Sequence, residues 1–251
     1  RFSMQPETET TLDGIRDIKV YQNKQGYRFS VDALLLSSFV NVRHVENIAD
    51  LGTGSGIIGL LLARKYPEAK VLLVELQKSL YALAKKNIVL NNMEERVDVL
   101  LADIKDMKKK VLPRSYDLVV YNPPFRKPET GCLSLGEEKA VARHELRLEF
   151  ADLAEAASHL LKVRGRFSMI FHPERLLEAI DILRRNRLEP KRTRFVHNDP
   201  AAGSKIVLIE AVKEGRPGLK VSSPLFIYDG KGAYTAELNE VYRVKAEGQA
   251  V

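Results

Sequence analysis

The stretch that decides the fold is Asn47-Ile48-Ala49-Asp50-Leu51-Gly52-Thr53-Gly54-Ser55-Gly56, followed by the apolar run from Ile57 to Lys65. Residues 47–51 are typical of a short strand, and the apolar spacing of residues 57–65 predicts a helix. The glycines between them remove side chains where the backbone must approach a ligand. A second strand, Ala69 to Val74, ends at Glu75, where a ribose-binding carboxylate belongs in a Rossmann-like βαβ unit.

The glycines alone leave two cofactors open, because Gly54-x-Gly56-x-x-Gly59 also satisfies the dinucleotide-binding pattern. Asp50 favours S-adenosylmethionine over a dinucleotide such as NAD. An acid at the end of the first strand would repel a pyrophosphate, whereas it suits the cationic amino-acid end of S-adenosylmethionine. The hypothesis is that Asp50 orients that end while Glu75 holds the ribose hydroxyls. A tight turn that binds no ligand is the plain alternative.

A second motif, Asn122-Pro123-Pro124-Phe125, follows the apolar strand from Asp117 to Tyr121, so it lies at the carboxyl end of a strand. An exocyclic aromatic amine is a weak nucleophile, because its lone pair is delocalised into the ring. The side-chain oxygen of Asn122 and the carbonyl of Pro123 could accept its hydrogens and favour attack. The prolines stiffen the turn, and Phe125 offers a face for base stacking. An ordinary turn is the alternative.

The two motifs together resemble those of class I S-adenosylmethionine-dependent amino-methyltransferases, which modify adenine, guanine or glutamine amino groups. Three more segments are similar to the bacterial enzymes that methylate the N6 amine of the adenosine beside the anticodon, position 37, of a valine tRNA. They are Thr11–Gly14, Gly26–Leu35 and Ala142–Glu145. The likeness covers about residues 11–242. For the Arg143-His144-Glu145 part, a helix-flanking ion pair is the plain interpretation.

The resemblance implies a Rossmann-like α/β fold, with a mainly parallel seven-stranded sheet, an antiparallel edge hairpin and S-adenosylmethionine as cofactor. The implied catalytic residues are Asn122, Pro123, Pro124 and Phe125. The implied cofactor-binding residues are Tyr27, Phe29, Asp32, Asp50, Gly52, Thr53, Gly54, Gly56, Glu75, Leu76, Asp103 and Asn122. Asp103 would accept from the cofactor adenine amino group, and it could equally cap a helix from Ile104.

Outside the motifs, strands and helices alternate, which predicts a parallel sheet. The expected helices are 31–41, 78–91, 149–162 and 174–186, and the further strands are 97–101, 166–171, 193–197 and 205–212. The last two have no helix between them, so they should pair antiparallel. Residues 18–22 and 27–30 could form a hairpin. One domain over residues 1–251 is expected, with an N-terminal extension of about 11–45 and a C-terminal tail of about 214–251.

The composition indicates the cellular compartment. No apolar stretch approaches the roughly 20 residues that cross a bilayer. Residues 1–11 are polar, without the apolar core of a signal peptide, and Cys132 is the single cysteine, which excludes an intramolecular disulfide. A cytoplasmic protein is therefore expected. His197 and Asp199 fall short of a metal site, so no metal is predicted.

The charge is +7, from 40 basic and 33 acidic side chains, and it is clustered. The clusters are Arg184, Arg185, Arg187, Lys191, Arg192 and Arg194, then Lys105, Lys108, Lys109, Lys110 and Arg114, then Arg126 and Lys127. They could follow an RNA backbone, or they could be solvated faces. Tyr228, Tyr234 and Tyr242 could contact RNA or pack. The leading hypothesis is a tRNA adenine methyltransferase. The alternatives are an rRNA guanine-N2 methyltransferase, a protein glutamine methyltransferase and a silent RNA-binding module.

Overall fold

The computed structural model describes residues 10–23, 31–123 and 135–243, and for residues 135–146 it describes the backbone alone. The strands are β1 Thr10–Ile15, β2 Ile18–Asn23, β3 Asn47–Leu51, β4 Lys70–Glu75, β5 Val97–Leu101, β6 Tyr116–Tyr121, β7 Leu161–Phe171, β8 Leu188–His197, β9 Ser204–Lys213, β10 Lys220–Val221 and β11 Leu225–Phe226. The α-helices are α1 Val31–Phe39, α2 Ile57–Lys65, α3 Lys78–Leu90, α4 Met107–Lys110, α5 Leu135–Leu160, α6 Leu176–Arg185 and α7 Ala236–Tyr242. Short 3₁₀ helices η1 Ile104–Asp106 and η2 Pro173–Arg175 precede α4 and α6.

One large sheet organises the described residues, in the order β10-β8-β9-β7-β6-β3-β4-β5 with β11 also paired to β8. Strands β3 to β7 run parallel, and β9 lies antiparallel between β7 and β8. The parallel strands need crossover connections, and the helices between them supply these. Because β6, β3, β4 and β5 are parallel neighbours, the segments that follow them emerge at one edge of the sheet.

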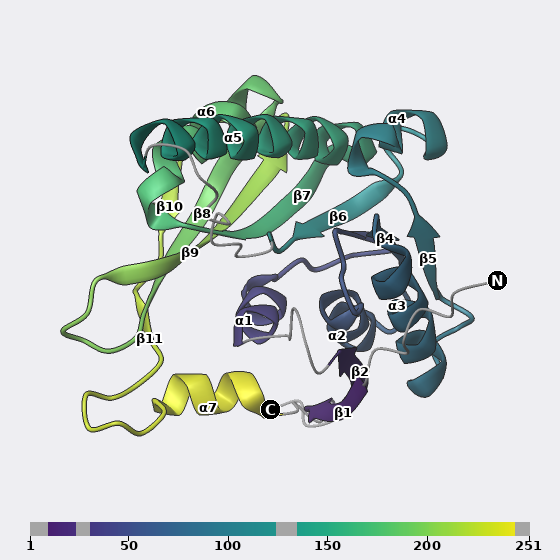
Figure 1. The fold of residues 1–251 in the computed structure, drawn as a ribbon, viewed down its shortest axis with the longest axis horizontal. Coiled ribbons are helices and arrows are strands. Elements are labelled where there is room, and N and C mark those ends of the chain that lie inside the picture. The colour runs from purple at the N-terminus through teal and green to yellow at the C-terminus, as the bar shows by residue number, and fades with distance from the viewer. Residues whose placement is uncertain (1–9, 24–30, 124–134, 244–251) are drawn as a thin grey trace.

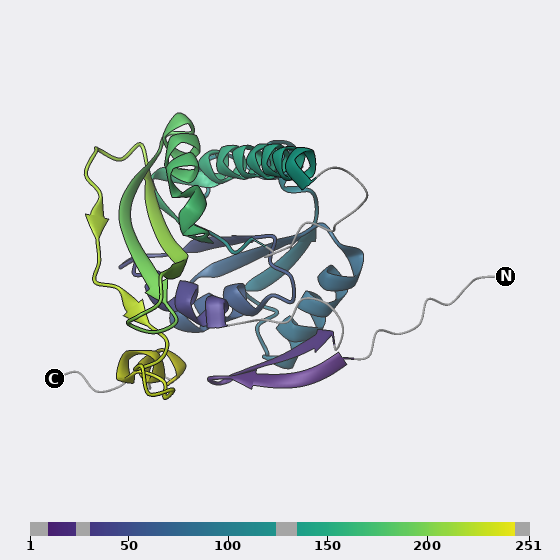
Figure 2. The same ribbon diagram turned by 60° about the vertical axis from the view of Figure 1, so that its left-hand side comes forward.

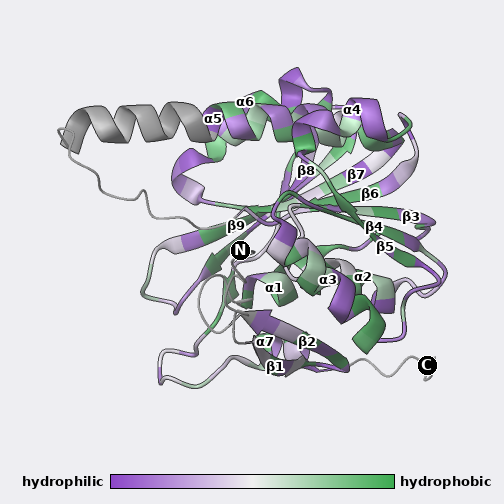
Figure 3. Ribbon diagram, turned by 45° about the vertical axis from the view of Figure 1, so that its right-hand side comes forward, coloured by the Kyte–Doolittle hydropathy of each residue, from purple (hydrophilic) through white to green (hydrophobic). Residues whose placement is uncertain are grey.

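Helices cover both faces of this sheet (Figure 1). Helices α1, α2 and α3 lie on one face, and α4, α5 and α6 on the other. Figure 2 shows the hairpin β1–β2 outside the α1–α3 layer, with α7 beside it. The hydropathy colours place apolar residues mainly on the strands and on the inner sides of the helices (Figure 3). Two buried clusters follow, one on each face, around Leu34, Leu60 and Leu73 and around Phe150, Leu160 and Phe167.

The structure confirms the predicted fold class. Strands β3 to β9 make up the expected mainly parallel seven-stranded arrangement, with β8–β9 as the antiparallel hairpin. The short strands β10 and β11 add to it beyond β8. Among the described residues no helix is both long and apolar enough to span a bilayer.

The structure leaves one local prediction untested and corrects another. Residues 18–22 form a strand as predicted, and the whole of β2 pairs with β1, whereas the predicted partner, residues 27–30, lies outside the described residues. The polar sequence Thr-Thr-Leu-Asp-Gly-Ile gives β1 little strand signal, so its partner could not be read locally. Helix α5 begins at Leu135 rather than 149. Its first half is rich in helix-forming Leu, Glu, Lys and Ala, but lacks the apolar stripe on which the prediction depended.

Candidate active site

The two motifs meet at one edge of the sheet. In the parallel register Leu51 lies opposite both Tyr121 of β6 and Val74 of β4. Glu75, the last residue of β4, pairs with Leu101 at the end of β5. The glycine loop, Glu75, Asp103 and Asn122 therefore follow four neighbouring strands at their carboxyl ends. This is the edge where open α/β sheets bind ligands.

The glycine loop has a backbone that other residues rarely adopt. Gly52, Gly54 and Gly56 have φ values of 65°, 61° and 89°, in the left-handed region that favours glycine. A hydrogen bond from Thr53 N to Val74 O (3.0 Å) fixes the loop to β4. A Cβ built on Gly54 would meet no atom of the described residues within 4 Å, so none of them covers this part of the loop. The loop is thus shaped to approach a ligand with its backbone.

Glu75 binds this loop directly, although its side chain is only 5% exposed. Its Oε2 accepts a hydrogen bond from Gly54 N (2.9 Å), and its Oε1 accepts one from Gln77 N (2.8 Å). A carboxylate has about four lone-pair positions, so about two stay available for ligand hydroxyls. Glu75 therefore fixes the loop and can still bind a diol.

Asp50 is buried, at 1% exposure, beneath the same loop. Its Oδ2 accepts from Thr53 Oγ1 (2.5 Å) and from Gly59 N (3.0 Å), so it ties the loop to the first turn of α2. Burial raises the pKa of Asp50 to about 7, the two hydrogen bonds oppose this, and nearby Glu75 adds to it. Asp50 organises the site from below, and its predicted contact with a cofactor amine stays a prediction.

This pKa predicts a pH-dependent stability. Unfolded Asp50 ionises near its ordinary pKa of 3.8 and the folded group near 7, so between these values the folded chain binds more protons. The free energy of unfolding should therefore fall as pH rises through this window, by at most about 4 kcal/mol for this group. Asp50→Asn does not titrate and keeps an acceptor. The melting temperature of this variant, relative to that of the unchanged chain, should therefore rise between about pH 5 and about pH 8. Asp98→Asn, at an exposed position on β5, is the control; a difference for Asp50→Asn that stays constant with pH would refute the assignment.

Gly59 is a close-packing glycine between α2 and β4. A Cβ there would lie 2.1 Å from Leu73 Cδ2, inside the buried core, and 3.3 Å from Asp50 Oδ2. Gly59→Ala should cost about 1–3 kcal/mol of unfolding free energy, as overpacking does. Leu73→Ala in the same chain should recover part of that cost, which a double-mutant cycle in urea measures. Gly203→Ala, where a Cβ meets no atom within 4 Å, is the matched control. Strictly additive effects of the two changes would rule out the contact.

Asn122 and the glycine loop are joined by Tyr121. A Cβ on Gly52 would lie 3.5 Å from Tyr121 Cε2, so the tyrosine ring packs under the start of the loop. Burial raises the pKa of Tyr121 to about 12, with a smaller contribution from Glu149, so its hydroxyl stays protonated. Asn122 follows at 9% exposure, and the next residue is the half-buried Pro123. Asn122 is thus nearly buried at the rim, next to the start of the glycine loop.

The remaining predicted site residues fall into two groups. Asp32 is buried in the first turn of α1, and Leu76 is 62% exposed beside Glu75. Asp103 caps η1, because its Oδ1 accepts from Lys105 N (2.9 Å); the predicted capping role is confirmed, and the adenine contact stays a prediction. Tyr27, Phe29, Pro124 and Phe125 lie outside the described residues, as do Cys132, Arg126 and Lys127.

Sequence reasoning missed Asn87 of α3, which is completely buried. Its Nδ2 donates to Ser55 O in the glycine loop (2.8 Å) and to Tyr21 O of β2 (3.0 Å), while its Oδ1 accepts from Tyr21 N (2.7 Å). One amide therefore joins the cofactor loop to the N-terminal hairpin. The signal available in the sequence was a polar asparagine on the apolar side of the predicted helix 78–91.

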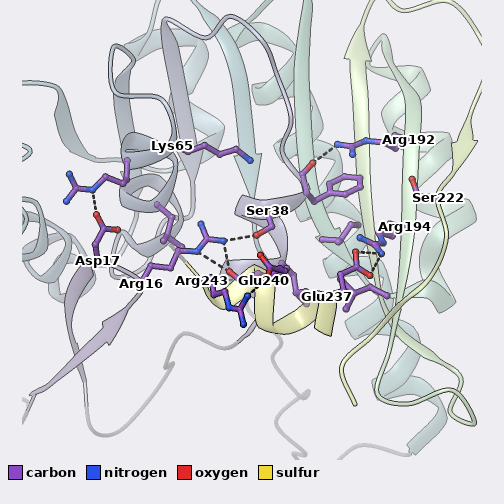
Figure 4. Close-up of a pocket in the computed structure, with 17 residues that line it drawn as sticks. Arg16, Asp17, Ser38, Lys65, Arg192, Arg194, Ser222, Glu237, Glu240 and Arg243 are labelled. Carbon is purple, nitrogen blue, oxygen red and sulfur yellow. Dashed lines mark hydrogen bonds and ion pairs between the residues drawn. The ribbon is translucent and has the colours of Figure 1, made fainter. Parts of the chain in front are cut away.

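Most of the predicted basic clusters prove to be paired with acids inside the chain. Arg184 binds Glu189, Arg185 binds Asp181, Lys105 binds Asp152 and Lys108 binds Glu155. Arg192 and Arg194 face a cavity of about 720 Å³ between α1, α2, α7 and β8 (Figure 4). Arg192 binds Glu210 and lies 3.9 Å from the Phe39 ring centroid, and Arg194 binds Glu237. Among the described residues, a phosphate track through these clusters would therefore have to compete with acids of this chain for most of the cations.

That cavity is separate from the rim. Its wall includes Phe39 and Lys65, the last residues of α1 and α2, whereas the first turn of α2 begins at the glycine loop. Lys65 donates to the carbonyls of Ser37 and Val40 at the end of α1, and Arg192 donates to that of Phe39. These cations cap a helix C-terminus, where positive charge is favourable. In the described residues no three His, Cys, Asp or Glu side chains gather as metal ligands.

Comparison with known proteins agrees with this geometry. The methyltransferase small domain family matches residues 30–184. A tRNA1(Val) (adenine(37)-N6)-methyltransferase from Pedobacter heparinus is 30% identical over 226 residues, which cover 88% of this chain and 91% of the relative. One of the same name from Phocaeicola vulgatus is 28% identical over 194 residues, covering 77% and 80%.

Solved structures show the same fold. The crystal structure of a predicted O-methyltransferase from Agrobacterium tumefaciens superposes with a TM-score of 0.69 at 24% identity, covering 84% of this chain and 95% of that one. That of TrmN from Thermus thermophilus gives 0.54 at 19% identity, covering 72% and 48%. These superpositions show the fold, and the family match and the Pedobacter relative show that the chain belongs to the methyltransferase small domain family.

Proposed function

We propose that this chain transfers a methyl group from S-adenosylmethionine to the exocyclic N6 amine of an adenosine in the anticodon loop of a tRNA, at position 37 of valine tRNA. The observation that carries the proposal is the placement of Asn122 beside the glycine loop, on adjacent strands β6 and β3. The substrate class comes from the names of the Pedobacter and Phocaeicola relatives.

The residues at the rim fit S-adenosylmethionine. No described residue comes within 4 Å of a Cβ on Gly54, so these residues leave room there for the amino-acid end of the cofactor. Glu75 keeps lone pairs for the two ribose hydroxyls, and the exposed Leu76 next to it offers an apolar surface for the adenine. Asp103 lies one strand further along, where its second oxygen can accept from the adenine amino group. The order of these groups along the rim matches the order of groups in the cofactor.

When bound, S-adenosylmethionine supplies a methyl group on a cationic sulfur whose leaving group is a neutral thioether. The chain must therefore mainly hold the amine in line with that carbon, and alignment of this kind is worth roughly 7–11 kcal/mol. Asn122 Oδ1 and Pro123 O would accept the two amine hydrogens, which orients the nitrogen lone pair. As the nitrogen becomes positive, these hydrogen bonds strengthen. Asn122 would not remove the proton, because an amide has no useful proton affinity near neutral pH; the C–S bond breaks as the N–C bond forms, and the cationic nitrogen then loses its proton to solvent.

An unpaired base is the cheapest substrate for such a turn. Extruding a base from a stack costs a few kcal/mol, least when the base is already unpaired. An anticodon-loop adenosine therefore needs little more than the stacking that one aromatic residue provides, roughly 1–3 kcal/mol. A duplex target would require a wedge side chain, which the described rim does not contain.

Labelled methyl transfer tests the function directly. The chain would be incubated with methyl-labelled S-adenosylmethionine and fractionated tRNA, rRNA, DNA and protein, followed by nucleoside and amino-acid analysis. The expected product is N6-methyladenosine in tRNA, confined to valine tRNA. Methylguanosine in rRNA or methylglutamine in protein as the sole product would replace the proposal by one of those activities. No incorporation into any substrate, with cofactor bound, would favour a silent RNA-binding module.

A further inference from the structure

Three tyrosines near the C-terminus form a stacked column on the surface. The ring centroids of Tyr228 and Tyr234 are 5.3 Å apart at 25°, and those of Tyr234 and Tyr242 are 5.7 Å apart at 15°. These separations are typical of offset stacking, in which each ring slides past its neighbour and leaves part of its face uncovered. The three side chains are 37%, 45% and 37% exposed in that order. Leu238 of α7 is fully buried and already anchors this helix, so the exposed faces of the tyrosine rings are not required for its packing.

The backbone around the column is fixed. Tyr228 N donates to Asn198 O (2.7 Å), Tyr228 and Tyr234 form an isolated antiparallel bridge, and Thr235 caps α7 through Leu238 N (3.2 Å). Asp229 holds the turn between the first two tyrosines, accepting from Lys231 N (2.7 Å) and Ala233 N (3.2 Å). The rings are thus preorganised, so little side-chain entropy of the tyrosines is lost when a ligand stacks on them.

The charges beside the column balance one another. Glu237 pairs with Arg194 and Glu240 with Arg243, so both acids of α7 are neutralised by neighbouring cations. Lys231 is exposed in the turn between Tyr228 and Tyr234. Partial burial raises the pKa of Tyr242, and the adjacent Tyr234 adds to this, so the phenol stays uncharged near neutral pH. A polyanion therefore meets uncharged rings, and the exposed Lys231 and Asp229 of the adjoining turn offset each other in charge.

The column begins beyond the carboxyl end of β8, which runs in the same direction as β6. Strand β11 runs parallel to the end of β8, pairing Phe226 with His197, so Tyr228 continues past the carboxyl end of β8. From β6 the sheet crosses β7, β9 and β8 to reach β11, and Tyr228 lies some five residues beyond the level of Asn122. At about 4.8 Å per strand and 3.3 Å per residue the separation is roughly 25 Å. The segment between β11 and α7 lies at the lower left of Figure 1.

We infer that Tyr228, Tyr234 and Tyr242 form a docking surface for unpaired nucleotides of the RNA substrate outside the target base, with bases stacking on the uncovered ring faces. This inference rests on the proposed function. A separation of roughly 25 Å exceeds one nucleotide and lies within a folded RNA, so the column contacts a different part of the same molecule. Since much of the basic surface is paired with acids, stacking supplies affinity that charge alone does not. Base–aromatic stacking tolerates any sequence, so the column holds the RNA without reading it.

The chain contains no tryptophan, which makes a stacking probe possible. Tyr234→Trp should keep a stacking face, and its fluorescence should be quenched by a valine tRNA transcript with the same Kd that direct binding gives. Leu112→Trp is the matched control, because Leu112 is 78% exposed and precedes β6 at the opposite edge of the sheet. The emission of that control should not change. An unquenched Tyr234→Trp chain that binds and methylates the transcript would overturn the inference.

Affinity separates stacking from packing. Tyr234→Leu and Tyr242→Leu should each raise the Kd for the transcript about 5-fold to 100-fold, while Tyr234→Phe stays within about 2-fold. The Kd for S-adenosylmethionine and the slope of log K against log salt should not move, because neither the cofactor rim nor a phosphate contact is altered. Equal RNA affinity in both leucine variants would refute the surface, as would loss in the phenylalanine variant. A Tyr234→Leu chain that instead dissociates from dimer to monomer in sedimentation would assign the column to a second copy of this chain. Failure of the unchanged chain to methylate any RNA would count against the proposed function instead.

Discussion

Asn122→Ala is expected to lower kcat for methyl transfer by about 100-fold to 1,000-fold, the size of effect seen when one hydrogen-bonding group that stabilises a transition state is removed. The amide oxygen would hold an amine hydrogen that becomes more acidic as the nitrogen attacks, so its loss acts on the transition state more than on binding. The Kd for S-adenosylmethionine, measured by calorimetry, should stay within about 3-fold, because β3 separates the strand that Asn122 follows from the strand that ends at Glu75.

The control for this change is Asn41→Ala, at an exposed asparagine after α1. It should leave kcat and melting temperature unchanged. Single-turnover kinetics keep chemistry separate from product release, which could otherwise mask a slower transfer step. Normal single-turnover rates for Asn122→Ala would mean that the turn after β6 is not the catalytic group.

Glu75→Ala should show the opposite pattern, with a Kd for S-adenosylmethionine raised about 10-fold to 100-fold. Hydrogen bonds to a charged group are worth about 1.5–3 kcal/mol, so the net loss of one such bond to the ribose accounts for a change of this size. Removing it also leaves Gly54 N and Gln77 N without their acceptor, which loosens the cradle itself. At saturating cofactor, kcat should fall much less than in Asn122→Ala.

Glu75→Gln and Glu68→Ala complete the set. The glutamine keeps one acceptor oxygen, so its Kd should lie between those of the unchanged chain and of Glu75→Ala. Glu68 is exposed before the start of β4, at the far end of the same strand, and its loss should change nothing measurable. Calorimetry that finds the same cofactor Kd in Glu75→Ala would remove Glu75 from the site.

The parts of the fold that the sequence predicted are those with a strong local signal. The strand–glycine–helix stretch from Asn47 to Lys65 appears with the predicted bounds, because buried parallel strands and an apolar helix leave clear patterns. The convergence of Gly52 and Asn122 also followed from the sequence, since both come after buried strands of one parallel sheet. The relative placement of segments could be predicted where it depends only on the alternation of strands and helices along the chain.

What escaped prediction depends on contacts between distant segments. The sequence placed Arg192 and Arg194 in a basic surface cluster. In the structure Arg192 lies over the Phe39 ring and binds Glu210, and Arg194 binds Glu237 of α7. Nothing local to residues 184–194 reveals these acids. Asn87 likewise takes its role from Ser55 and Tyr21, which lie far from it in the chain. Side-chain partners across the fold were invisible to a pattern along the chain.

The central claim is that one rim of the sheet holds S-adenosylmethionine against the Asn122 turn, and a crystal structure with S-adenosylhomocysteine tests it most directly. The ribose should lie on Glu75, the amino-acid end on the loop at Gly52–Gly56, and the thioether sulfur next to Asn122. The ligand seated instead in the 720 Å³ cavity beside Lys65 and Arg192 would contradict the account.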